Sequence, residues 1–144
     1  MATDKEFTDS LSCFKARRAY GALERDFLVP IGTSTFLHDA EREALLYQYN
    51  SQHGILTILD TNKCHFAHHV GDDCDTLLFN MIESLNSLGW EKVVVNFPGV
   101  LPFSHIKICS NGKYKGMLEW FYELHHGYEV MEHVANWVIG ELQS

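Results

Sequence analysis

Metal-binding and acid–base side chains are densest in the middle of the chain, between positions 64 and 74. Thiolate, imidazole and carboxylate groups are the ligand types that zinc and related ions accept. On a strand, His65 and His69 would lie about 13 Å apart, too far to share one ion. A metal or enzymatic site would therefore have to use the residues at the strand end, namely His68, His69, Asp72 and Asp73. We weigh this against a strand that runs into a helix cap, where aspartates are favoured by the helix dipole, and we favour the cap.

Two other pairs have spacings that are used in catalysis. His105 and Cys109 could act as base and nucleophile if they touched, but on a predicted strand they lie too far apart. Glu123 and His126 have the Glu-x-x-His spacing of di-iron bundles, yet neither of the other predicted helices carries the matching motif. The P-loop, GxGxxG, GxSxG and HExxH signatures are absent from the sequence. We therefore predict no catalytic residue, no metal and no cofactor.

Apolar side chains stand at two places where polar ones are expected. The segment 97–103 lies between two predicted strands and holds two prolines, which make it stiff. The last helix carries apolar residues on its predicted solvent side. The candidate partner-binding residues are Phe97, Val100, Leu101, Phe103, Val130 and Trp137. An equally weighted alternative is that the loop forms a lid over the core.

The elements that must position these residues follow from hydrophobic periodicity. Residues Asp75–Leu88 form an apolar stripe at helical spacing, and Gly89 stands where a left-handed residue ends a helix. A strand is predicted over Lys92–Asn96 and another over His105–Ser110. Asn111-Gly112 is the strongest short signal for a hairpin turn, and it predicts a short return strand over Lys113–Lys115.

The rest of the chain yields two more helices and a three-strand meander. One helix is predicted over Asp4–Leu28, where a change of phase near Gly21 indicates a kink or two short helices. The other is predicted over Met117–Leu142, with one apolar stripe facing the core: Met117, Trp120, Phe121, Leu124, Tyr128, Met131, Ala135, Val138 and Leu142. His125-His126-Gly127 resembles a local stop signal, but the stripe keeps its phase across Gly127, so one continuous, bent helix is favoured. Three apolar runs with short polar links predict the meander, Ala44–Asn50, Gly54–Leu59 and Cys64–Val70, with a helix through Asp39–Asn50 as the rival of the first. The predicted fold is one α+β domain over residues 1–144. Its antiparallel sheet comprises this meander and the C-terminal hairpin, with an N-terminal, a central and a long C-terminal helix packed on it.

This order of elements resembles that of the small acidic chaperones dedicated to type III secretion effectors, and more loosely roadblock and profilin-like domains. The formal charge of −8 argues against nucleic acid and favours a basic protein partner. We also expect no membrane segment and no signal peptide, and the four cysteines without a CxxC pair favour a reducing cytoplasm.

The leading hypothesis is a non-catalytic protein-binding module of the cytosol: an adaptor, an inhibitor or immunity-type protein, or a dedicated chaperone, most simply a homodimer. The first alternative is a small metal- or ligand-binding enzyme that uses the His68, His69, Asp72 and Asp73 cluster. The second is a small-ligand pocket between sheet and helices. Its predicted lining is Tyr47, Tyr49, Phe66, Trp120 and Phe121.

Overall fold

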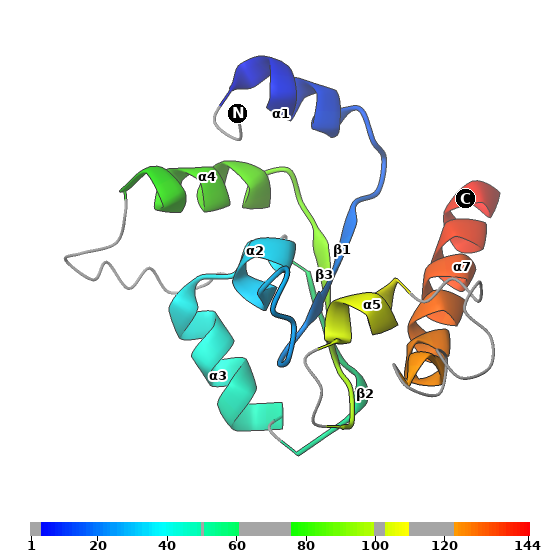
Figure 1. The fold of residues 1–144 in the computed structure, drawn as a ribbon. Helices are drawn as coiled ribbons and strands as arrows, with labels where there is room; N and C mark the ends of the chain where they lie inside the picture. The colour runs from blue at the N-terminus through cyan, green and yellow to red at the C-terminus, as the bar shows by residue number, and fades with distance from the viewer. Residues whose placement is uncertain (1–3, 50, 61–75, 100–102, 110–122) are drawn as a thin grey trace.

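A mixed three-stranded sheet lies at the centre of the computed structural model, which describes residues 4–49, 51–60, 76–99, 103–109 and 123–144. The strands are β1 (Arg18–Ala22), β2 (Gly54–Asp60) and β3 (Glu91–Asn96). Their order in the sheet is β1-β3-β2, with β1 parallel and β2 antiparallel to β3 (Figure 1). Within these ranges no helix has the length and apolar character needed to cross a membrane.

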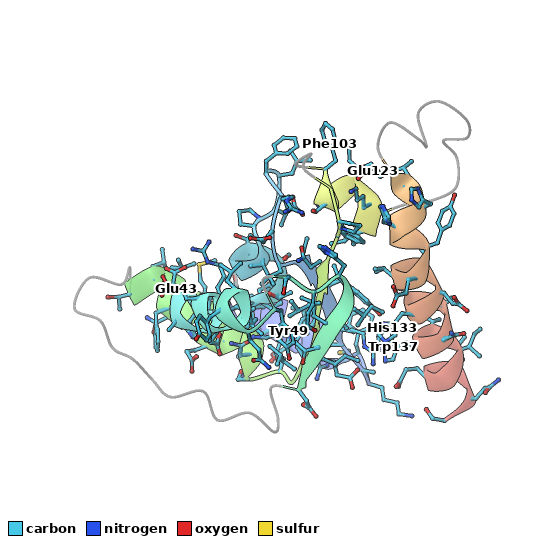
Figure 2. All side chains as sticks on the ribbon, turned by 90° about the horizontal axis from the view of Figure 1, so that it is seen from below. Glu43, Tyr49, Phe103, Glu123, His133 and Trp137 are labelled. Carbon is cyan, nitrogen blue, oxygen red and sulfur yellow. The ribbon has the colours of Figure 1, made fainter. Side chains whose placement is uncertain are left out.

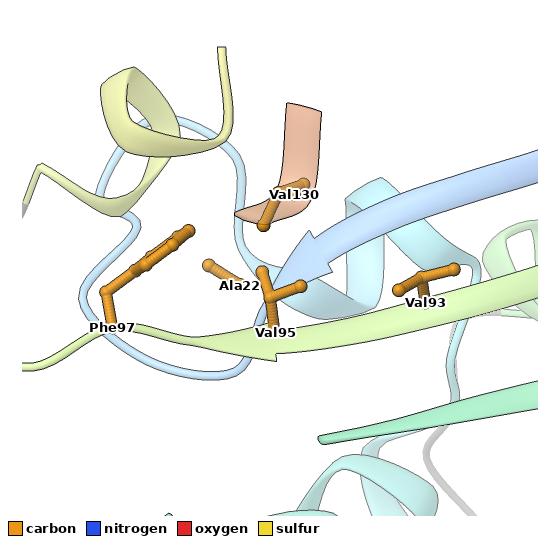
Figure 3. Close-up of a cluster of buried hydrophobic side chains, with 5 residues drawn as sticks. All are labelled: Ala22, Val93, Val95, Phe97 and Val130. Atoms are coloured by element: carbon orange, nitrogen blue, oxygen red, sulfur yellow. The ribbon is translucent and has the colours of Figure 1, made fainter. Parts of the chain in front are cut away.

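Strand β3 lies in the centre of the sheet, and its three valines are fully buried. Val93 and Val95 pack on one face of the sheet with Ala22, Phe97 and Val130 (Figure 3). Val94 points to the opposite face, where its buried neighbours are Leu23, Ile31, Leu37 and Leu45. Burial of each valine contributes about 1.5–3 kcal/mol, and a run of β-branched residues buried on both faces is typical of an interior strand.

Helices cover both faces of this sheet (Figure 1). On the Val94 side lie α2 (Ile31–Thr35) and α3 (Asp39–Tyr49), and on the Val95 side lie α5 (Ser104–Ile108) and α7 (Tyr128–Gln143). The remaining helices are α1 (Lys5–Ser12) and α4 (Thr76–Asn86). His38 ties α4 to the turn before α3, because its Nε2 lies 3.1 Å from the Glu83 carboxylate.

The junction between α4 and β3 confirms the predictions for the central helix, its glycine stop and the strand that follows. Gly89 has a φ of 73°, the left-handed conformation expected after the helix. The Trp90 indole Nε1 donates a hydrogen bond of 2.9 Å to the Leu85 carbonyl. The Trp90 ring also stacks edge-on against Phe36, with 5.3 Å between the ring centroids.

The predicted N-terminal helix over Asp4–Leu28 is wrong. The helix ends at Ser12, and β1 occupies Arg18–Ala22. The change of phase near Gly21 therefore reflects a new element rather than a kink. A Cβ at Gly21 would lie 2.5 Å from Ser34 Oγ, so glycine is needed here for β1 to pack against α2.

The predicted antiparallel sheet is also wrong, because β1 pairs with β3 in parallel. In the meander, Gly54–Leu59 is a strand as predicted. Residues 44–49 belong instead to helix α3, which was the rival prediction, and Asn50 lies outside the described residues. The run Cys64–Val70 lies outside the described residues.

The C-terminal hairpin is not formed by His105–Ser110, since α5 covers Ser104–Ile108. At helical spacing, Ser104 and Lys107 both turn inward and are buried, which a strand would not allow. The predicted turn at Asn111-Gly112 and the return strand lie outside the described residues.

A long C-terminal helix is present, but α7 begins at Tyr128, and residues 117–122 of the predicted helix lie outside the described residues. A 3₁₀ turn over Leu124–Gly127 precedes α7, and Glu123 before it has a left-handed φ of 52°. The His125-His126-Gly127 stop signal therefore marks a real boundary. The element order that suggested a secretion-chaperone, roadblock or profilin-like fold is not the order observed.

Candidate functional site

Helix α7 contacts the sheet through the side that we predicted to face solvent. Val130 is buried, and a hydrogen bond of 2.9 Å joins His133 Nδ1 to the Tyr20 hydroxyl. The Arg18 guanidinium lies 4.7 Å from the centroid of the Trp137 ring. Figure 2 shows His133 and Trp137 between α7 and the sheet. Burial, followed by the nearby positive charge of Arg18, lowers the pKa of His133 below its usual value, which favours a neutral ring at this contact.

The part of the apolar stripe that lies on α7, which we predicted to face the core, is on the opposite side of this helix and is exposed, whereas Leu124 before α7 is buried. We call Met131, Ala135, Val138, Ile139 and Leu142 the outer seam. Among them Met131 is 38%, Val138 42%, Ile139 51% and Leu142 82% exposed. Met131, Ala135, Val138 and Leu142 are spaced alternately four and three apart, which is the a/d repeat of helices that pack against other helices.

The charges beside the outer seam are acidic. Glu132 and Glu141 stand on the exposed part of α7, and the sequence of the helix contains no lysine or arginine. The carbonyl end of a helix favours cations, so Glu141 in its last turn leaves a negative region uncompensated by α7 itself. Lys15 reaches the end of the chain, where its Nζ donates to Ser144 Oγ at 2.9 Å.

Four of the predicted partner-binding residues lie in the described part of the chain, and all four are buried or half-buried there. Phe97 and Val130 belong to the same buried cluster, so for Phe97 the structure has the core-lid arrangement. Phe103 is half-buried and packs edge-on against Phe27, with 6.4 Å between the centroids. Trp137 is half-buried beneath Arg18. Val100 and Leu101 lie outside the described residues.

The Glu-x-x-His pair has a structural role. The Lys107 ammonium group is buried, and it donates hydrogen bonds of 2.7 Å to Glu123 Oε2 and 3.0 Å to the Pro98 carbonyl. The hydrogen bond from Lys107 holds the pKa of Glu123 below its usual value. Burial lowers the pKa of His126. Glu123 therefore serves as the counter-ion that allows Lys107 to be buried between α5 and the start of α7.

His105 lies on helix α5 rather than on a strand, and Cys109 is the residue that caps the end of this helix. His105 Nδ1 is 3.4 Å from the nearly buried carboxylate of Asp26, whose Oδ1 accepts hydrogen bonds from the backbone of Leu28 and Val29. Cys109 is an exposed free thiol at the end of the helix. Asp26 therefore anchors His105 to the loop after β1, and nothing in this arrangement activates the thiol.

The metal hypothesis is neither supported nor tested by the structure. His68, His69, Asp72 and Asp73 lie outside the described residues. In the described part of the chain, no group of three or more histidine, cysteine or acidic residues could hold an ion. In the predicted aromatic pocket, Tyr47 is exposed to solvent and Tyr49 half-buried, while Phe66, Trp120 and Phe121 are outside the described residues.

A different cavity, of about 310 Å³, lies between α4 and the segment that carries α2 and the start of α3. Six of the residues around it are large and apolar: Phe36, Leu37, Leu78, Met81, Ile82 and Leu85. Sequence reasoning missed it because its two walls are far apart in the chain.

Comparisons with protein-family models, with curated proteins and with solved structures found no match to this chain. The residues themselves therefore carry the functional argument.

Proposed function

We propose that this chain is a non-catalytic protein-binding module of the adaptor, inhibitor or dedicated-chaperone kind, and that its docking surface is the outer seam of α7. The observation that carries the proposal is the seam itself, an exposed apolar stripe on a helix whose other side already packs on the sheet. Contiguous exposed apolar residues of this kind mark interaction sites in soluble proteins.

The spacing of the seam favours a helix as the partner. Side chains that repeat every 3.5 residues on average pack as knobs into the holes of a facing helix. Ala135 lies in the middle of the seam, where its small side chain lets a second helix come close. The partner element is therefore an amphipathic helix.

The charges favour a basic partner over a second copy of the chain. A homodimer through the seam, which the sequence suggested, would bring together two surfaces that both carry Glu132 and Glu141. A partner helix with lysines or arginines beside its apolar stripe would instead meet opposite charges at both positions. The homodimer remains the competing occupant in the test below.

We further propose that the module acts in the cytoplasm. In the described part of the chain Cys13 and Cys109 are exposed free thiols. Exposed thiols persist as thiols in a reducing compartment.

The proposal is tested by calorimetric titration with a helical peptide as long as α7, with leucine at its a and d positions and lysine elsewhere. A matched peptide with glutamate in place of lysine is the control. We expect the basic peptide to bind and to bind more weakly as salt is added, because the charges are exposed. The double variant Met131→Gln with Val138→Gln should weaken binding by about tenfold or more, since each buried apolar side chain contributes about 1.5–3 kcal/mol.

The variant Asn136→Gln, on the same helix but outside the seam, should leave binding unchanged. Equal binding of the two peptides, or full binding by the double variant, would contradict the proposal. Dimerisation of the unmodified protein in light scattering, lost in the double variant, would identify a second copy as the occupant instead.

A further inference from the structure

The cavity between α4 and α3 combines an apolar interior with one positively charged residue, Arg42, among the described residues of its lining. Its volume of about 310 Å³ lies at the lower end of the range of about 300–1,000 Å³ that is typical of small-molecule pockets. The wall from α4 presents Leu78, Met81, Ile82 and Leu85, four residues at the spacing of a single helix face. The apolar part of a ligand could lie against this wall.

Arg42 supplies the polar end of the site. Its Nε is buried and has no hydrogen-bond partner among the residues that the structure describes. Buried N–H donors in proteins are normally hydrogen-bonded, so an acceptor bound beside Arg42 would be stabilised there. The guanidinium group presents its donors in a planar fork that matches a carboxylate, so a carboxylate oxygen is the acceptor that fits best.

We propose that this cavity binds a small apolar monocarboxylate, with its tail against α4 and its carboxylate on Arg42. Asp39, which also lines the cavity, limits the ligand to a single negative charge. Asp39 lies at the start of α3 and is exposed, so its repulsion of the ligand is weakened by solvent. This site is separate from the outer seam of α7, which lies on the other side of the sheet (Figure 1).

The test uses decanoate as the probe, with decanol and decylamine as neutral and cationic controls of the same chain length, all below their aggregation limits. Binding to the full chain is measured by calorimetry. We expect decanoate to bind about tenfold or more tightly than decanol, because a charge-assisted hydrogen bond forms only with the acid. Decylamine should bind no better than decanol.

Three variants assign the contacts. Arg42→Met keeps the apolar stem of the side chain and removes the charge, so it should abolish the preference for decanoate over decanol. Asp39→Asn should tighten the binding of decanoate, because it removes a side chain with the same charge as the ligand. Leu78→Ser, at a half-exposed position of the wall, should weaken both ligands together. Far-UV circular dichroism of each variant shows that the fold is kept.

The proposal is overturned if decanoate does not bind, or if Arg42→Met binds the acid as tightly as the unmodified protein does. It is equally overturned if decylamine is the tightest of the three probes, because Asp39 rather than Arg42 would then set the specificity. None of these outcomes depends on the binding of the basic peptide to α7.

Discussion

Lys107 is a buried cation beside the start of α7, and its positive charge is balanced by an ion pair with Glu123. The side chain of Lys107 is 2% exposed, and an unpaired charge at such a position is strongly destabilising. The lowered pKa of Glu123 means that the folded protein binds fewer protons than the unfolded chain. The pair therefore contributes stability that is fully present above the ordinary carboxyl pKa of 4.5 and is lost as the pH falls through the lower pKa of the folded protein.

The variant Glu123→Gln should accordingly lower the free energy of unfolding at neutral pH by about 1–3 kcal/mol, because Lys107 loses a charged partner. The deficit should shrink as the pH falls from 4.5 through the lower pKa that Glu123 has in the folded protein, because its carboxyl group then becomes protonated in the unmodified protein as well. Chemical denaturation at several pH values measures both effects. Glu132→Gln, at an exposed position, is the matched control and should be nearly neutral. A deficit that stays constant into the acid range would show that Glu123 is not the counter-ion.

Single residues were predictable from the sequence where the signal is local. Gly89 was identified as the left-handed residue after α4 because a glycine directly follows an apolar helical stripe. The role of Arg18 could not be identified in this way. It contacts Trp137 and forms an ion pair with Glu91, and both partners are distant in the sequence.

Strand β1 and helix α7 each contain a glycine, and the space around the two glycines differs. Gly21 lies beneath α2, where a Cβ would be 2.5 Å from Ser34 Oγ and 2.6 Å from Thr35 Cγ2. Gly140 is exposed near the C-terminal end of α7, and a Cβ there would meet no atom within 4 Å. The first glycine is needed for packing, whereas the second only weakens its helix.

Gly21→Ala should therefore destabilise the protein by about 1–3 kcal/mol through overpacking. Gly140→Ala should stabilise it by about 0.5–1 kcal/mol, because alanine is the better helix former and the site is open. The two melting curves should shift in opposite directions. If Gly21→Ala is neutral, the close packing of β1 on α2 is wrong.

The two apolar stripes of α7 explain why its orientation was predicted wrongly. Periodicity shows that a helix has an apolar side, but it does not show what covers that side. The stripe that contains Met131, Val138 and Leu142 is the more regular, and we assigned it to the core. The sheet is instead covered by Val130, His133 and Trp137, where polar and aromatic groups find specific partners.

For the whole molecule, local hydrophobic patterns were enough to predict where α4, β2 and β3 lie in the sequence. They did not reveal the order of the strands in the sheet. Strand β1 pairs in parallel with β3, so Arg18 lies opposite Glu91 although the two are far apart in the chain. A parallel pair has no connecting turn that a sequence pattern could reveal. The same distance in sequence separates the two walls of the ligand cavity, so neither the sheet order nor the cavity could be predicted from neighbouring residues.

The whole-molecule charge of −8 and the acidic flanks of the outer seam lead to the same class of partner, a basic amphipathic helix. Nuclear magnetic resonance of the labelled protein during titration with the basic peptide tests this most directly. We expect the backbone signals of Met131, Val138 and Leu142 to shift progressively, while those of the buried residues Val93–Val95 stay in place. The assignment of the outer seam as the docking surface would be contradicted if the signals of α7 did not shift. It would also be contradicted if the largest shifts were those of Leu78, Met81 and their neighbours.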